Sequence, residues 1–274
     1  VINGKGPQDY QDAVLFYEKT YITAGLQELI STVLGRLSGS SKGQSVIQLQ
    51  TSFGGGKTHS LLSLYHIVKN SDKVKHMPVV KDLMEAAGAK DLSDVKVAGF
   101  VGTHADPLKG KTPWGELAHQ LGVYDVVKEH DKTRIATGKK VLSDMLDKAG
   151  PSLILIDELL EYVVKKDRAE EVRDIVKGQT LAFLQELTEA VSNHPRTVLV
   201  LTLPASAYEQ YDEQAEKSLI QLQKVSGREE TIFNPVEGAE IYEVVRKRLF
   251  QKIGSEKTRR EVAQWFFSLY NELD

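Results

Sequence analysis

A glycine cluster followed by a lysine and a threonine carries the most specific chemistry in this 274-residue chain. It reads Gly54-Gly55-Gly56-Lys57-Thr58 and stands between a short apolar run and a helical pattern. Glycines let the backbone turn tightly and direct N–H groups at phosphate oxygens, where a helix N-terminus adds a favourable dipole. We therefore expect a phosphate-binding loop, with Lys57 on the β- and γ-phosphates and the Thr58 hydroxyl on Mg²⁺.

The loop departs from the usual pattern at its first position, where Thr51 replaces a glycine. A residue with a side chain fits there when its backbone angles are ordinary. We include Phe53 and His59 in the predicted nucleotide-binding set, and the alternative for His59 is a packed helix residue. The alternative for the whole segment is a glycine-rich turn that precedes Lys57 and Thr58 by chance.

Two adjacent acids, Asp157 and Glu158, follow the apolar run 153–156. Ligands bind at the carboxyl ends of strands in open α/β sheets. We expect Asp157 to hold the Mg²⁺ shell and Glu158 to polarise the water that attacks the γ-phosphate. The alternative is a helix cap by Asp157 with Glu158 in the first turn. Such adjacent acids are typical of additional-strand NTPases, and the lack of an Asn-Lys-x-Asp stretch favours ATP over GTP.

Further polar residues stand at or near other strand ends. Thr202 closes the fourth apolar run, where a hydroxyl can orient the attacking water. Arg228 precedes the last run and is a candidate for stabilising transition-state charge in a neighbouring subunit. Arg246 and Arg248 compete for that role, and a solvated surface arginine is the alternative for all three.

His104 and Asp106 follow the second apolar run, at another strand end. Their location makes contact with substrate or nucleotide conceivable. A lone His-x-Asp pair is weak evidence for a metal site and is more often part of a turn. We therefore assign these two residues no role.

The elements that must position these residues follow from apolar runs at 46–49, 95–101, 153–156, 198–201 and 231–233. Helical patterns separate the runs, which predicts a mostly parallel sheet covered on both faces. We expect a three-layer α/β fold of the P-loop NTPase class with strand order 5-1-4-3-2. In this order the strand of Thr202 lies between the strand of the glycine loop and that of the acids.

The predicted organisation is an N-terminal lead-in and helix over 1–43, a P-loop ATPase core over 44–235, and the start of a helical lid over 236–274. The sequence begins at Val1 without a methionine and ends at Asp274 after a helical pattern. We therefore expect a fragment of a longer protein, whose remainder is a partner of this part.

Composition bounds the function classes. Apolar residues make up 41% and charged residues 27%, which is ordinary for a globular chain. Cysteine is absent, which excludes disulfides and thiolate metal sites. An apolar run of membrane-spanning length and a signal-peptide pattern are both lacking. We expect a cytoplasmic protein without a membrane partner.

Basic residues cluster in the long connection before the acidic pair, but the formal net charge of the chain is -3. The cluster consists of Lys128, Lys132, Arg134, Lys139 and Lys140, with acids between them. We interpret it as a solvated face rather than a nucleic-acid patch, because the total charge gives no support to a polyanionic partner.

Four strings together resemble an uncharacterised prokaryotic ATPase family of large proteins, a domain-of-unknown-function family linked to anti-phage defence or DNA-modification loci. They are TSFGGGKTHSLL at 51–62, VGTHADP at 101–107, WGELA at 114–118 and LILIDEL at 153–159. The first and last are shared by many ATPases, and the strings around His104 and Trp114 are specific to the family. The resemblance implies an AAA+-like core that binds ATP and Mg²⁺ through residues 54–58 and the two acids.

The function predicted is Mg²⁺-dependent ATP hydrolysis that drives a conformational change in a larger protein. A homo-oligomer is one expected state of assembly. Three alternatives stay open. The chain could be an ATP-binding switch with little turnover, a nucleic-acid-stimulated motor, or a small-molecule kinase. The adjacent Glu158 argues for water as the acceptor and so against the kinase.

Overall fold

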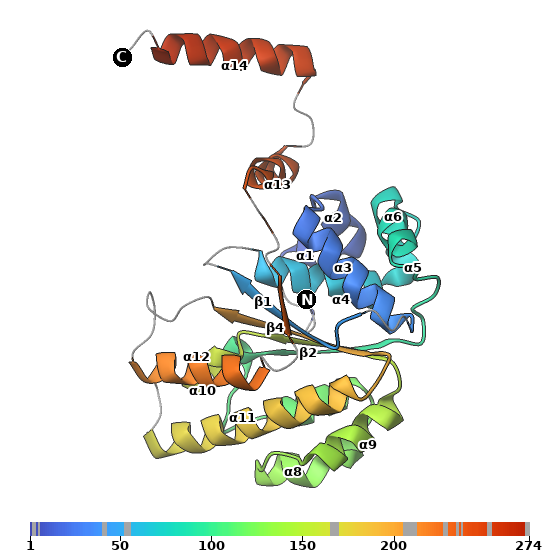
Figure 1. Ribbon diagram of the computed structural model, residues 1–274, viewed down its shortest axis with the longest axis vertical. Helices are drawn as coiled ribbons and strands as arrows, with labels where there is room; N and C mark the ends of the chain where they lie inside the picture. The colour runs from blue at the N-terminus through green and yellow to red at the C-terminus, as the bar shows by residue number, and fades with distance from the viewer. Residues whose placement is uncertain are drawn as a thin grey trace.

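A parallel sheet between two layers of helices organises the computed structural model (Figure 1). The structure describes residues 1, 4, 6–39, 43–51, 56–164, 170–204, 213–226, 230–233, 236, 238–250 and 254–271. Its strands are β1 Val46–Thr51, β2 Lys96–Val101, β3 Ser152–Asp157, β4 Thr197–Pro204 and β5 Glu230–Phe233. They pair in parallel in the order β2-β3-β4-β1-β5, which read from β5 is 5-1-4-3-2.

The first third of the chain supplies the helices that cover one face of the sheet. This layer comprises α1 Gln8–Gln11, α2 Ala13–Glu18, α3 Ala24–Leu37, α4 Lys57–Lys69, α5 Ser71–Val74 and α6 Pro78–Ala86. Side chains alternate along each strand, so Leu153 and Leu155 of β3 pack into this layer. Asp12 and Thr23 cap α2 and α3 by accepting backbone N–H bonds, which fixes where these helices begin.

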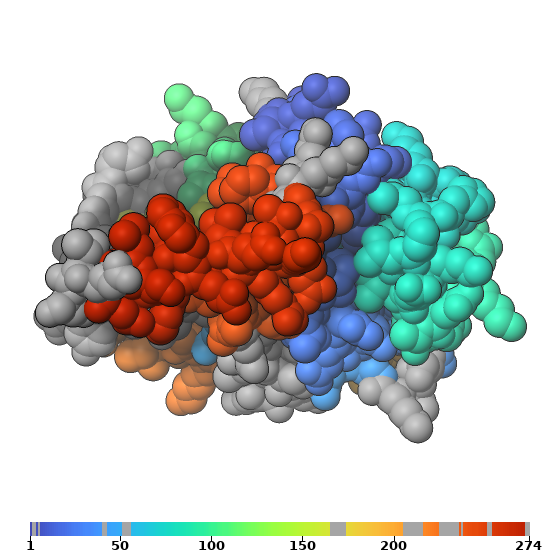
Figure 2. All heavy atoms as spheres, turned by 90° about the horizontal axis from the view of Figure 1, so that it is seen from above, coloured from blue at the N-terminus to red at the C-terminus, as the bar shows by residue number. Residues whose placement is uncertain are grey.

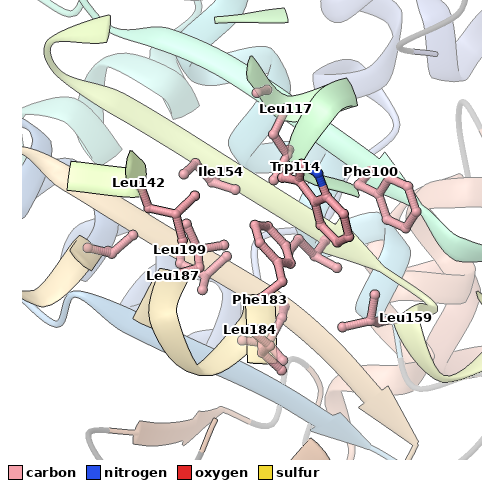
Figure 3. Packing of buried hydrophobic residues seen from close by; sticks show 14 of the residues in the cluster. Phe100, Trp114, Leu117, Leu142, Ile154, Leu159, Phe183, Leu184, Leu187 and Leu199 are labelled. Atoms are coloured by element: carbon pink, nitrogen blue, oxygen red, sulfur yellow. The ribbon is translucent and has the colours of Figure 1, made fainter. Parts of the chain in front are cut away.

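The other face carries η1 Gly102–His104, α7 Pro113–Gln120, η2 Tyr124–Val126, α8 Lys128–Thr133, α9 Lys139–Ala149, α10 Leu159–Val164, α11 Glu170–Ser192 and α12 Glu213–Ser226. Figure 3 shows the core of this layer, where the rings of Trp114 and Phe183 lie 5.5 Å apart between centroids. Ile154 of β3 and Leu199 of β4 point into the same cluster. Trp114 is therefore a core residue that packs against the sheet.

A side chain pairs with the outer edge of β2 at Gly99. The Gln120 amide accepts a hydrogen bond from the Gly99 N–H at 2.8 Å and donates one to the Gly99 carbonyl at 2.9 Å. It also donates to Glu116 at 2.6 Å, which holds the amide in place. A side chain thus makes the pair of bonds that a neighbouring strand would make.

Two C-terminal helices, α13 Glu240–Leu249 and α14 Glu256–Asn271, follow the sheet and bury none of their side chains. Figure 1 shows α14 as the helix farthest from the sheet. Within the described ranges, no helix combines the length and the apolar character needed to cross a membrane. The division into lead-in, core and lid stays a prediction.

Candidate functional site

The glycine loop joins the end of β1 to the start of α4, as the sequence predicts. Gly56 has φ 84°, a left-handed conformation that favours glycine, and it stands directly before Lys57, the first residue of α4. This turn brings the N-terminus of α4 to the carboxyl edge of the sheet, where the N–H groups of a first helical turn lack partners within the helix. Phe53, Gly54 and Gly55 lie outside the described residues.

A chain of hydroxyls and one carboxylate connects three elements at this edge. The Thr58 hydroxyl of α4 donates to Asp157 Oδ2 at 3.0 Å, and the Thr202 hydroxyl of β4 donates to Asp157 Oδ1 at 2.6 Å. Asp157 is only 7% exposed and ends β3. Because both of its oxygens face these hydroxyls, the geometry favours a site residue over a helix cap.

The Lys57 ammonium group interacts electrostatically with the carboxylates of Asp157 and Glu158. Partial burial lowers the pKa of its ammonium group, while the carboxylates of Asp157 and Glu158 oppose that shift. The two carboxylates thus favour the charged form of a half-buried lysine. Bound phosphates would strengthen that support, so the charge pattern suits an anion held by Lys57.

Glu158 sits in a constrained backbone position. Its φ is 53°, which is uncommon for a residue with a side chain and clusters at functional sites. Its N–H donates to Thr202 Oγ1 at 3.1 Å, so one hydroxyl serves both adjacent acids. Its carboxylate accepts from the Thr103 hydroxyl at 2.7 Å and is otherwise exposed at the surface.

Gly102 and Thr103, in η1 directly after β2, are functional candidates that the sequence interpretation missed. A Cβ on Gly102 would stand 2.0 Å from the Glu158 carbonyl oxygen, so only glycine allows this approach. Thr103 reaches the Glu158 carboxylate directly. The signal is present in the sequence, because both residues directly follow an apolar run and the strand ends of a parallel sheet share one edge.

His104 lines a cavity that Asp157 and Glu158 also line. Asp106 accepts from the Leu108 N–H at 2.8 Å, the pattern of a local turn, which favours the turn interpretation. His104 lies in η1 with an exposed side chain. Arg228 lies outside the described residues, so its role stays a prediction.

His59 packs inside the N-terminal layer. Its ring stacks on Phe16 at 4.6 Å between centroids, and its Nε2 lies 3.1 Å from Thr20 Oγ1. Burial, and secondarily the charge of Arg248, lowers its pKa to about 4, so the ring is neutral. These contacts favour the packing interpretation over direct contact with phosphate.

The basic cluster of the long connection is engaged locally. Lys132 pairs with Glu129 at 2.8 Å and Lys139 with Glu189 at 3.1 Å. Arg134 donates to two backbone carbonyls of the loop that precedes α7. The ion pairs of Lys132 and Lys139 favour a solvated face over a nucleic-acid patch.

A cavity of about 450 Å³ adjoins the acids. Thr58, Asp157 and Glu158 form one end of it, and Phe100 and Tyr10 are among the residues that line the rest. Within the described part of the chain, no group of three or more His, Cys, Asp or Glu side chains could hold a metal ion. A cation at Thr58 and Asp157 would need oxygen ligands from water or from a bound phosphate.

Fold and site together define a parallel α/β protein with a glycine turn, a lysine and an acidic pair at the carboxyl edge of its sheet. The chain belongs to the DUF499 N-terminal domain family, whose model matches residues 1–229. The helices α13 and α14 lie beyond the matched residues.

The other comparisons are sparse. None of the curated proteins matches the chain. Among the solved structures that match, the structure of C. elegans PCH-2 shares 13% sequence identity with a TM-score of 0.36, covering 91% of this chain and 55% of that one. The chain therefore spans little more than half the length of that structure.

Proposed function

We propose that this chain is an ATPase domain that binds ATP with Mg²⁺ at the carboxyl edge of its sheet, in the manner of AAA+-like P-loop proteins. The observation that carries the proposal is the 3.0 Å hydrogen bond from Thr58 to Asp157. It brings together a hydroxyl and a carboxylate that are 99 positions apart in sequence, the two groups that this class of site uses to hold its metal.

The residues present fit a hard divalent cation that keeps most of its water. Mg²⁺ prefers oxygen ligands and is commonly held by one or two protein groups together with substrate phosphates. Thr58 and Asp157 would supply the protein oxygens, and the cation would bridge and neutralise phosphate charge when bound. Thr202 holds Asp157 from the other side, so the carboxylate is already oriented.

The protein side of the proposed hydrolysis uses three groups. Lys57 stabilises negative charge on the phosphates, Glu158 accepts a proton from the attacking water, and Thr202 fixes the backbone of Glu158. ATP hydrolysis would then drive a conformational change in the larger protein. Arg228, a homo-oligomer, the link with anti-phage defence loci and a cytoplasmic location stay predictions, and nothing in the fold or the comparisons bears on the defence link.

Isothermal titration calorimetry with Mg·ATP tests the binding step. Lys57→Ala should weaken affinity by about 10- to 100-fold, which corresponds to charge-assisted hydrogen bonds of about 1.5–3 kcal/mol. Lys69→Ala, at the exposed far end of the same helix, is the matched control and should bind like the wild type. Equal affinity in the two variants would remove the basis of the proposal.

An ATP-binding switch with little turnover is the second candidate. It is favoured by the Thr103–Glu158 hydrogen bond, which engages the proposed base in the structure as it stands. Phosphate release by wild type and Glu158→Gln separates the two functions. Loss of about 100-fold or more in the variant supports hydrolysis, whereas equal, near-zero rates with intact ATP binding support the switch.

A further inference from the structure

Helix α13 is attached at both of its ends to the N-terminal layer, although it buries none of its own side chains. At its start, Glu240 accepts a hydrogen bond from the Ala24 N–H at 2.9 Å. At its end, the Arg248 guanidinium lies over the Tyr10 ring, 4.8 Å from the centroid, and donates to the Tyr10 hydroxyl. Figure 2 shows α13, in orange-red, beside the blue N-terminal helices.

Tyr10 in turn rests on α4, the helix that begins with Lys57. Its ring meets the edge of His59 at 6.3 Å between centroids, and its carbonyl oxygen lies 2.9 Å from His66 Nε2. His59 directly follows Thr58. A continuous set of contacts thus runs from the first turn of α4, through Tyr10, to the end of α13.

The tautomer of His59 follows from its partners. The Thr20 hydroxyl donates to the Phe16 carbonyl at 2.7 Å, so its oxygen accepts from His59 Nε2–H. The ring is therefore fixed on one side by Thr20 and on its face by Phe16. If the first turn of α4 shifts when a ligand binds, the His59 ring moves together with Thr20 and Phe16. That movement reaches Tyr10 through the contact between the two rings.

The attachment at Arg248 is weak enough to respond. The guanidinium is 24% exposed, its Nη1 lies 4.0 Å from the nearer Asp9 oxygen, and that nitrogen is buried without a hydrogen-bond partner among the described atoms. A cation over an aromatic ring is a modest interaction. Because the end of α13 is held by this stacked guanidinium and its start by the Glu240–Ala24 hydrogen bond, a small change beneath Tyr10 can alter how firmly the helix is held.

We propose that Arg248 couples the position of α13 to occupancy of the phosphate site through Tyr10 and His59. The sign is positive, because a docked α13 brings the Arg248 cation toward the end of α4 where an anionic ligand would bind. By linkage, a ligand at Lys57 and Thr58 then favours the docked helix by the same factor. This inference rests on the proposed function and concerns regulation of the same site.

Hydrogen exchange of the α13 amides, measured with and without Mg·ATPγS on the whole chain, tests the coupling. In the wild type the ligand should slow exchange over Glu240–Leu249 by about threefold or more. Arg248→Gln should abolish the slowing and weaken ligand affinity by a similar factor, because coupling is reciprocal. Arg248→Lys, which keeps the charge but loses the planar stacking, should fall between the two.

Lys247→Gln is the matched control, since Lys247 is an exposed cation on the same helix. It should keep both the slowing and the affinity. Tyr10→Phe keeps the ring and removes the hydroxyl, and should lose part of the slowing.

Calorimetry on the same samples separates the two possible failures. If Mg·ATPγS does not bind, the proposed function fails and the coupling with it. If it binds while α13 exchange stays unchanged, or if Arg248→Gln responds like the wild type, the coupling alone is overturned.

Discussion

The Thr103 hydroxyl donates to Glu158 Oε2 across 2.7 Å, joining the end of β2 to the residue that follows β3. The two residues are 55 positions apart. Their contact matters because Glu158 is the group proposed to activate water, and a carboxylate oxygen engaged with a hydroxyl is less basic and less free to turn. Thr103 therefore restrains the proposed base in this conformation.

Thr103→Ala should release Glu158 and raise basal ATP turnover by about two- to tenfold, the factor equivalent to a net hydrogen bond of about 0.5–1.5 kcal/mol. Affinity for Mg·ATP should stay within about twofold of the wild type, since Thr103 has no proposed phosphate contact. Thr103→Ser keeps the hydroxyl and serves as the control. A steady-state phosphate-release assay decides, and an unchanged rate in the alanine variant would show that the hydrogen bond does not restrain the base.

Thr202→Val should destabilise the fold by about 1–3 kcal/mol. The Thr202 hydroxyl donates to buried Asp157 and accepts from the Glu158 N–H, and valine would leave both without that partner. Thr202→Ser should retain most of the stability. Urea unfolding followed by circular dichroism measures the difference, and equal midpoints for the valine and serine variants would contradict this account of the hydroxyl.

Gly102→Ala should cost about 1–3 kcal/mol and lower ATP turnover, because the new Cβ would force the Glu158 backbone away from its place. Gly178→Ala is a useful comparison, since Gly178 lies inside α11 with open space where a Cβ would go. That change should be neutral or stabilise the protein by up to about 1 kcal/mol. Thermal unfolding and phosphate release are measured for both variants. Equal melting temperatures and equal rates would refute the prediction.

Stability should fall as the pH drops below about 6.5, the ordinary pKa of histidine. Burial lowers the pKa of both His59 and His66 in the folded state, that of His59 to about 4. The unfolded chain therefore takes up protons first, so their contribution is complete above pH 6.5 and is lost progressively toward pH 4. For His59 the loss would reach about 3 kcal/mol.

Urea unfolding at pH 7.5, 6 and 5 measures that dependence. His66→Gln keeps a polar group for the Tyr10 carbonyl and removes one titrating ring, so its stability should fall less steeply over the same range. Parallel curves for wild type and variant would mean that His66 does not contribute.

The apolar runs predicted the sheet well, because parallel strands buried on both faces need an uninterrupted apolar sequence. Polar or turn-forming residues at the ends of the runs mark where the strands stop. All five predicted strands are confirmed, from β1 at Val46–Thr51 to β5 at Glu230–Phe233. The proximity of Thr58 to Asp157 also follows from pattern, since both stand at carboxyl ends of the sheet or at the helix start beside them.

Contacts that depend on tertiary structure could not be predicted in this way. The Thr103–Glu158 bond requires the unusual backbone of Glu158 and the close approach of Gly102, neither of which leaves a periodic signal. The placement of Arg248 over Tyr10 joins residues 238 positions apart. Trp114 shows the converse, since a family-specific string drew attention to a residue that proves to be core.

The Gln120 amide affects how this chain can associate with other molecules. An incoming strand at the β2 side would have to expel a group that already satisfies Gly99 and is itself anchored by Glu116. Gln120 therefore opposes edge-to-edge pairing of β2 with a strand of another molecule. Such pairing is a route to fibrils. Gln120→Leu would leave the Gly99 N–H and carbonyl available to the backbone of another molecule.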